Sequence, residues 1–346
     1  MDNTNTIKGV LIFMAVVLSF YLLKILSFIF IPFISAIFLA LLFTPLMRWL
    51  RRKKVPKWAS VTISAFIMLV VLFGTYQLIG LSVRQITQGQ TEFWEKADES
   101  LTTTWAPVTD MLDIEVSSDN NESIAKELMD NEKVSEWVYS HFGNTIAVVQ
   151  RMVVTILMML FFLILLLSGS LNVQQIFGTL VFNRKNSSVK AFSKIESSIV
   201  TFIKVKTLTS LMTGIGFGLT CYFFGVSFAL FWGLIAFATN YVQMIGSVVV
   251  TIFLALFALI DLTAPGSFLA FVLILVGIQV LVGGVLEPIF MGQSFRINTI
   301  TVLVMLMLWG YIWGVAGLIL SVPITVMLKI IFEQFKSTEV IVKVME

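Results

Sequence analysis

The feature that most restricts the fold of this chain is the length of its apolar runs. Residues 9–47 contain one charged side chain, that of Lys24, whereas a helix of about 20 apolar residues already crosses the hydrocarbon core of a bilayer. The runs are too long for the strands of a membrane barrel and lack the alternation of polar and apolar residues that such strands show. Lipid offers no partners to backbone polar groups, so helices are the remaining way to span it. The sequence therefore predicts an all-α integral membrane protein.

Charged residues gather in three blocks along the chain. Residues 48–57 contain six basic residues and no acidic one, and residues 84–136 contain thirteen of the twenty carboxylates against four basic residues. A third block, residues 184–206, carries six basic residues, the last of them Lys206, against Glu196 alone. Cytoplasmic loops of membrane proteins are enriched in lysine and arginine. The first and third blocks are therefore predicted to lie inside, the acidic block outside, and both termini in the cytoplasm.

These blocks and the apolar runs divide the chain into four predicted parts. Residues 1–82 hold an N-terminal helical hairpin, the basic loop and a third span, and residues 83–145 form a small acidic helical segment outside the membrane. Residues 146–206 hold a fourth span and a cytoplasmic amphipathic helix, and residues 207–346 form a core of broken helices.

The amphipathic helix is predicted from the spacing of apolar residues between Ser187 and Lys206. Its apolar face has lysines opposite it and consists of Val189, Phe192, Ile195, Ile199 and Phe202. Such a helix lies in the membrane interface with its apolar face toward the lipid. Membrane lipids are therefore expected partners of the chain.

The C-terminal part consists of apolar segments that are short for spanning helices. Residues 299–309 would rise only about 16 Å as a helix, roughly half the hydrocarbon thickness. Polar or glycine-rich stretches around residues 239–247, 286–292 and 309–317 separate these segments. Broken helices of this kind are typical of transporters and predict discontinuous or re-entrant segments. Tilted helices joined by ordinary surface loops are the alternative.

The stretch around Glu287 is the most polar interruption in this part of the sequence. Pro288 cannot donate a backbone hydrogen bond, so the helix is predicted to end there, and Gly292 lets the chain turn. Glu287 is expected either to bind a cation or proton inside the membrane or to lie at the cytoplasmic interface. Arg296 is its predicted partner, and a salt bridge that only fixes the turn is the alternative to a functional role.

Several classes of protein are excluded by what the sequence lacks. The composition is 58% hydrophobic and 12% charged, against roughly 25% charged for soluble domains, and nothing in it indicates nucleic-acid binding. The sole histidine, His141, and the sole cysteine, Cys221, offer no spacing for a metal site. There is no pairing of nucleophile and base within the spans and no phosphate-binding loop. We therefore expect no enzyme activity, no cofactor and no metal.

Two segments carry a resemblance to a known family. The segment "VLEPIFMGQSFRINTITVLVMLMLWGYIWGVAGLILSVPITVMLKI", residues 285–330, resembles the C-terminal signature of the autoinducer-2 exporter family, also called PerM-like permeases. The preceding "FGVSFALFWGLIAFATNYVQMIGSVVVTIF" is similar to its neighbouring block. The resemblance implies a bacterial transporter of about eight transmembrane helices that forms a homo-oligomer in the cytoplasmic (inner) membrane. Some members export a signalling furanone and others resemble sodium or lithium/proton antiporters.

Residues and resemblance together predict a secondary transporter that exports a small polar solute similar to autoinducer-2 and is coupled to an ion or proton gradient. The neutral amides of Asn240 and Gln243 and the indole of Trp309 suit such a solute, whereas the titratable carboxylate of Glu287 suits a monovalent cation or a proton. A sodium or lithium/proton antiporter is therefore the alternative, and a non-transporting membrane scaffold is the third possibility.

Overall fold

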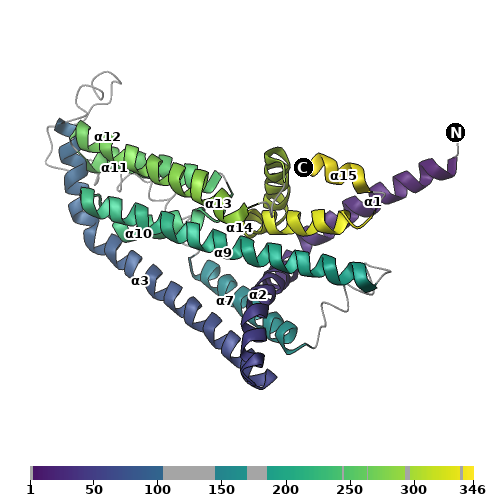
Figure 1. The fold of residues 1–346 in the computed structure, drawn as a ribbon. Coiled ribbons are helices and arrows are strands. Elements are labelled where there is room, and N and C mark those ends of the chain that lie inside the picture. Colours follow the sequence, from purple (N-terminus) through teal and green to yellow (C-terminus); the bar gives the residue numbers. More distant parts are fainter. Residues whose placement is uncertain are drawn as a thin grey trace. The chain divides into compact units, whose positions relative to one another are not determined.

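The computed structural model describes residues 3–103, 145–169, 185–243, 245–262, 264–292, 297–335 and 338–346. Over these ranges the chain is helical and contains no strand, which confirms the all-α prediction. Figure 1 labels the helices in chain order. Most of the predicted external acidic segment, His141 and Arg296 lie outside the described residues.

Six of the described helical segments are long and apolar enough to cross a membrane. They are Ile7–Ile25, Ser27–Arg52, Lys57–Gly89, Ser193–Phe224, Pro265–Met291 and Thr299–Phe332. Shorter apolar helices are Val153–Ser168, Ala229–Thr239 and Ile245–Asp261. The chain is thus a multi-pass membrane protein, and short apolar helices occur in its C-terminal half as the sequence indicated.

The described residues belong to two compact units. Unit 1 draws on residues 1–69, 151–203 and 293–346, and unit 2 on residues 70–150 and 204–292. Two helices, α3 (Lys57–Thr103) and α9 (Lys185–Phe224), contribute residues to both units.

Unit 1 is built around α2 (Ser27–Arg52) and α14 (Thr299–Phe332). α1 (Asn3–Ile25) precedes α2, and its side chains are exposed from Ile7 to Ser19. α7 (Thr145–Ser168) packs Leu163, Leu166 and Leu167 against α2, and α15 (Glu339–Met345) lies against α14. The core between α2, α9 and α14 contains Phe38, Leu41, Ile195, Ile199, Trp309, Ile312, Trp313, Ile324, Val326 and Ile330.

α14 is sharply bent in the middle. Gly314 has φ 59° and ψ −137°, values that a helix does not allow and that glycine adopts without strain. The two arms meet so closely that a Cβ on Gly317 would overlap the carbonyl oxygen of Trp309. Trp309 and Trp313 also lie against each other, with ring centroids 4.9 Å apart. The predicted interruption in this region is therefore present as a bend, and a re-entrant course in the membrane stays a prediction.

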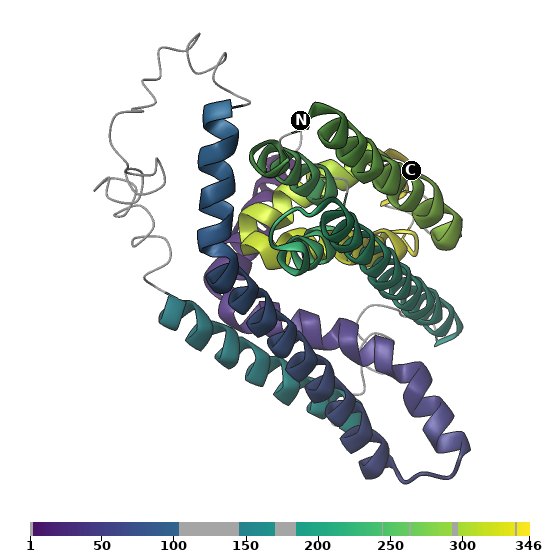
Figure 2. The ribbon, with the colours of Figure 1, turned by 90° about the vertical axis from the view of Figure 1, so that its left-hand side faces the viewer.

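Unit 2 is a helical bundle. Residues 204–224 of α9 lie beside α10 (Ala229–Thr239). α11 (Ile245–Asp261) contacts α10, and α12 (Pro265–Gln279) contacts α11. Figure 2 shows the same helices from the side. The backbones of α9 and α10 approach so closely that a Cβ on Gly214 would lie 2.8 Å from the carbonyl oxygen of Gly233. The bundle core consists of Phe217, Cys221, Val226, Trp232, Ala236, Val250, Leu254, Ala258, Phe271 and Leu275.

The chain leaves helical geometry between α10 and α11, as the sequence indicated. α10 ends at Thr239 and α11 begins at Ile245. The turn is tight, because a Cβ on Gly246 would overlap the carbonyl oxygen of Thr239. Asn240 and Gln243 lie in this turn.

The predicted helix end at Pro288 is wrong. A π-helix, Val280–Leu286, follows α12 directly, and α13 (Glu287–Met291) continues it past Pro288 to Gly292. Gly292 has φ 58° and ends the helix there. The π-helix before Pro288 is wider than an α-helix. The regular i−4 turn, in which the proline ring clashes with a carbonyl, is therefore absent at this place. The interruption is therefore a widened turn rather than a break.

Asp261 is an acidic residue at a helix end of unit 2. It is the last residue of α11 and is buried. Its carboxylate accepts hydrogen bonds from the backbone N–H of Ser227 and from the hydroxyl of Ser227, the latter at 3.0 Å. These bonds fix the turn between α9 and α10, where Phe228 has a left-handed φ of 61°.

Asp261→Ala is expected to reduce the free energy of unfolding by about 1.5–3 kcal/mol, because two hydrogen bonds to a carboxylate are lost and the half-buried Ser227 amide loses its partner. The change would be measured as a lower Tm of the detergent-purified protein. Glu339→Ala, which removes an exposed pair between Glu339 and Lys343, is the control and should change stability by less than about 0.5 kcal/mol. Equal Tm values for both variants would contradict the structural role of Asp261.

Candidate functional site

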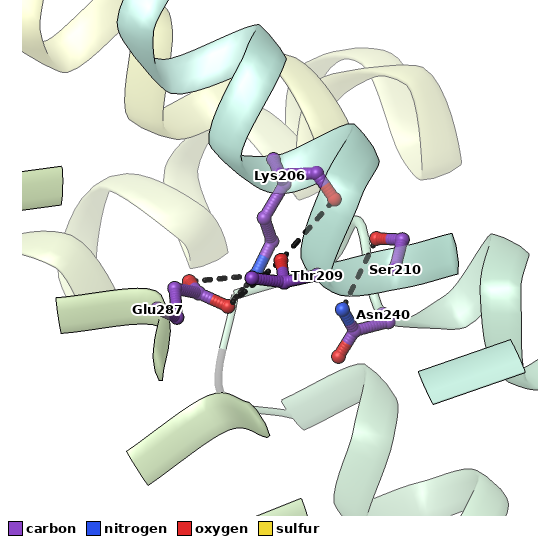
Figure 3. Close-up of polar contacts among 5 residues, drawn as sticks. All are labelled: Lys206, Thr209, Ser210, Asn240 and Glu287. Carbon is purple, nitrogen blue, oxygen red and sulfur yellow. Dashed lines mark hydrogen bonds and ion pairs between the residues drawn. The ribbon is translucent and has the colours of Figure 1, made fainter. Parts of the chain in front are cut away.

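A buried ion pair joins α9 to α13 inside unit 2. The ammonium Nζ of Lys206 lies 2.9 Å from Oε1 and 3.0 Å from Oε2 of Glu287. The two side chains are only 3% and 6% exposed. Figure 3 shows Lys206 reaching from α9 toward both carboxylate oxygens. Glu287 is thus paired with Lys206. Its predicted partner Arg296 lies outside the described residues.

Hydroxyl groups of the next turn of α9 adjoin this pair. Thr209 Oγ1 lies 3.5 Å from Glu287 Oε2 and 3.3 Å from the carbonyl oxygen of Lys206, to which it donates. Ser210 follows on the same turn, and its hydroxyl accepts a hydrogen bond of 3.1 Å from the amide Nδ2 of Asn240. One stretch of α9 therefore presents an ammonium and two hydroxyls to α13 and to the end of α10.

The turn after α10 supplies the remaining polar groups. Asn240 is buried at the C-terminal end of α10, and the hydroxyl of Tyr241 bonds to Thr207 of α9 at 3.0 Å. The side-chain oxygen Oε1 of Gln243 is buried and has no hydrogen-bond partner in the part of the chain that is described. Of the predicted residues, Glu287 and Asn240 therefore contact α9 at neighbouring turns, while Gln243 lies in the turn after α10.

The other predicted residues lie elsewhere. Pro288 is the second residue of the short helix α13, which begins at Glu287, and Gly292 follows its last residue. Trp309 is buried in the core of unit 1, where its ring packs edge-on against Phe20. Its indole N–H has no partner among the described residues.

Lys206 was not predicted as a site residue, because it belongs to the basic block that was predicted to lie in the cytoplasm. A signal for it was present in the spacing. Ile199, Phe202 and Lys206 follow at intervals of three and four residues, so they share one face of a helix. The structure buries this face of α9. A lysine on an apolar helix face needs a counter-charge, and Glu287 is that charge.

The arrangement has two chemical capacities. A carboxylate, an ammonium, hydroxyls and an amide together can bind the hydroxyl and carbonyl groups of a small polar solute. The carboxylate can also exchange its ammonium partner for a proton or a monovalent cation. Ionisable groups inside membrane-spanning segments are costly and usually mark a transport route. Among the described residues no three histidine, cysteine or acidic side chains gather as they would around a metal ion.

The chain is similar to known transport proteins along nearly its whole length. The model of a family described as AI-2E family transporter matches residues 10–337. The AI-2 transport protein TqsA of Escherichia coli is 26% identical over 306 residues, which cover 86% of this chain and 82% of TqsA. A Haemophilus influenzae protein is 25% identical over 341 residues, or 97% of this chain and 95% of that protein. The Escherichia coli protein YhhT is 27% identical over 302 residues, or 86% and 82% of the two chains.

Proposed function

The chain belongs to the AI-2E family of transporters, and from this premise we propose that it is a secondary transporter that exports a small polar solute of the AI-2 type. The relative TqsA is named for AI-2 transport, and the site around Lys206 and Glu287 offers the groups that a hydroxylated solute needs. Residues 207–346, together with Lys206, form the proposed transport core. The protein acts in the bacterial inner membrane, with both termini on the cytoplasmic side and several copies in one assembly.

The observation that carries this proposal is the buried pair between Lys206 and Glu287. An ion pair in a low-dielectric interior gains little stability over apolar residues of the same shape, so its presence supports a role other than stability. A hydroxyl of the solute can take the place of Glu287 as the hydrogen-bond partner of Lys206. Another can take the place of Lys206 as the partner of Glu287. Protonation of Glu287 removes the carboxylate charge, releases Lys206 and thereby couples solute binding to a proton gradient.

Sodium or lithium/proton antiport is the second candidate, and the surroundings of Glu287 favour it specifically. The two carboxylate oxygens and the Thr209 hydroxyl lie together, and oxygen atoms are the ligands that hard cations prefer. A monovalent cation would then bind in place of the Lys206 ammonium. A proton would compete for the same carboxylate.

Flux through purified protein in liposomes tests the proposal. With an imposed pH gradient, AI-2 is expected to move faster than through protein-free liposomes, and dissipating the gradient should slow it. Flux of sodium or lithium with countermoving protons, without AI-2 flux, would favour the antiporter. Absence of all of these fluxes would contradict transport of either kind.

A further inference from the structure

Thr213, one turn beyond Thr209 on α9, carries a buried hydroxyl that takes no part in the contacts of the Lys206–Glu287 pair. The residue is 1% exposed. Its Oγ1 has no hydrogen-bond partner within the described residues. Buried polar groups are normally satisfied, so an unpaired hydroxyl at this depth needs an explanation.

Neighbouring hydroxyls on α9 behave differently. Thr209 donates to the carbonyl oxygen of Lys206, Thr220 donates to that of Gly216 at 2.7 Å, and Ser210 accepts from Asn240. Bonding back to the preceding turn is the usual behaviour of threonine in a helix. Thr213 lacks this bond, which leaves its hydroxyl available to another partner.

The position of Thr213 follows from the contacts on either side of it. Toward the C-terminal end of α9, a Cβ on Gly216 would lie 3.2 Å from the side chain of Ile278 in α12. Toward the N-terminal end, Lys206 and Thr209 lie against Glu287. The two helical segments therefore run antiparallel, and Thr213 lies at the level of the π-helix Val280–Leu286.

This π-helix gives a second, independent sign of function at the same level. π-turns are rare and occur frequently at functional sites. Within this segment Val282 is buried, whereas Gly283 and Gly284 are exposed and have open space beside them. Val282 therefore faces the protein interior at about the level of Thr213.

We propose that the Thr213 hydroxyl is a further binding position for the transported solute, next to the Lys206–Glu287 pair. The inference rests on the proposed function. Thr213 lies one helical turn, a rise of about 5.4 Å, beyond Thr209, whose hydroxyl is 3.5 Å from the Glu287 carboxylate. A small solute with two or more hydroxyl or carbonyl groups can therefore reach from Glu287 to Thr213. The hydroxyl can donate and accept, and it gains its missing partner when the solute binds.

Thr213→Val tests this role because valine keeps the shape of threonine and removes only the hydroxyl. In liposomes carrying the full chain, with AI-2 as the probe, the variant is expected to raise KM by about three- to tenfold. This is the change expected from the loss of one hydrogen bond to a neutral group. Its Tm should equal or exceed that of the wild type, since no bond within the protein is lost. Thr213→Ser keeps the hydroxyl and should restore the wild-type KM.

Thr220→Val is the matched control, because that hydroxyl is bonded within its own helix. It should leave KM unchanged. Wild-type KM in Thr213→Val would overturn the inference, as would a marked fall in its Tm or a failure of Thr213→Ser to restore binding. If the wild type itself moves no AI-2, the proposed function fails and this inference with it. Flux in the wild type without an effect of Thr213→Val overturns this inference alone.

Discussion

Replacing Glu287 by glutamine is expected to abolish gradient-driven flux and to lower the free energy of unfolding by about 3–5 kcal/mol. The stability falls because the ammonium of Lys206, which is 3% exposed, loses its counter-charge, and breaking a buried pair on one side is strongly destabilising. The flux falls because no carboxylate remains to exchange a proton or cation. Flux in liposomes and Tm in detergent measure the two effects separately.

A double variant separates the functional role of this pair from its structural role. Lys206→Met combined with Glu287→Gln removes both charges, and such neutral replacements of buried pairs often recover or exceed the original stability. We expect the Tm to return close to that of the wild type while flux stays absent. Wild-type flux in the double variant would show that the pair only holds α9 and α13 together.

An exposed ion pair provides the control for charge removal. Lys194 and Glu333 lie 2.5 Å apart with side chains that are 55% and 24% exposed. Pairs in contact with solvent contribute about 0–1 kcal/mol. Glu333→Gln should therefore leave flux unchanged and move the Tm by little.

Gly317→Ala is expected to destabilise the protein by about 1–3 kcal/mol or more, because the bend of α14 has no room for a methyl group. The added Cβ would overlap the Trp309 carbonyl oxygen, which belongs to backbone and cannot turn away. Overpacking of this kind forces the backbone to shift. A lower Tm and a changed tryptophan fluorescence would report it, since Trp309 and Trp313 lie at the bend.

Gly277→Ala is the matched control for this prediction. Gly277 lies inside α12, and no described atom lies within 4 Å of a Cβ built on it. Alanine in a helix interior is favoured over glycine by about 0.5–1 kcal/mol. This variant should keep or raise the Tm. A fall as large as that of Gly317→Ala would mean that glycine is needed for reasons other than close contact at the bend.

The sequence predicted the features of this fold that depend on local chemistry. Long apolar runs predicted the spanning helices, and the polar turn at Asn240 predicted the end of α10. Prediction from the sequence failed where a residue far away in the chain determines the environment of a side chain. Lys206 was predicted to lie in the cytoplasm because it belongs to a basic block. Its burial depends on the counter-charge of Glu287, which lies 81 residues later in the sequence.

Pro288 illustrates the second limit of prediction. Its effect on a helix depends on the turn before it, and local rules assume an α-turn there. The segment Val280–Leu286 forms a π-turn instead, so the helix survives the proline. Of the candidate site, the sequence indicated the acidic and amide residues but not the lysine or the backbone that presents the carboxylate.

The π-helix has a consequence for how this family can vary in length. A π-turn accommodates one residue more than an α-turn, so losing one residue between Val280 and Leu286 can convert the segment to regular α-helix. Such a deletion leaves α12 and α13 in their original rotation about the helix axis, and Glu287 still faces Lys206. A deletion in an ordinary spanning helix turns every later side chain by about 100°. A chain with one residue fewer at this place can therefore keep the carboxylate in register.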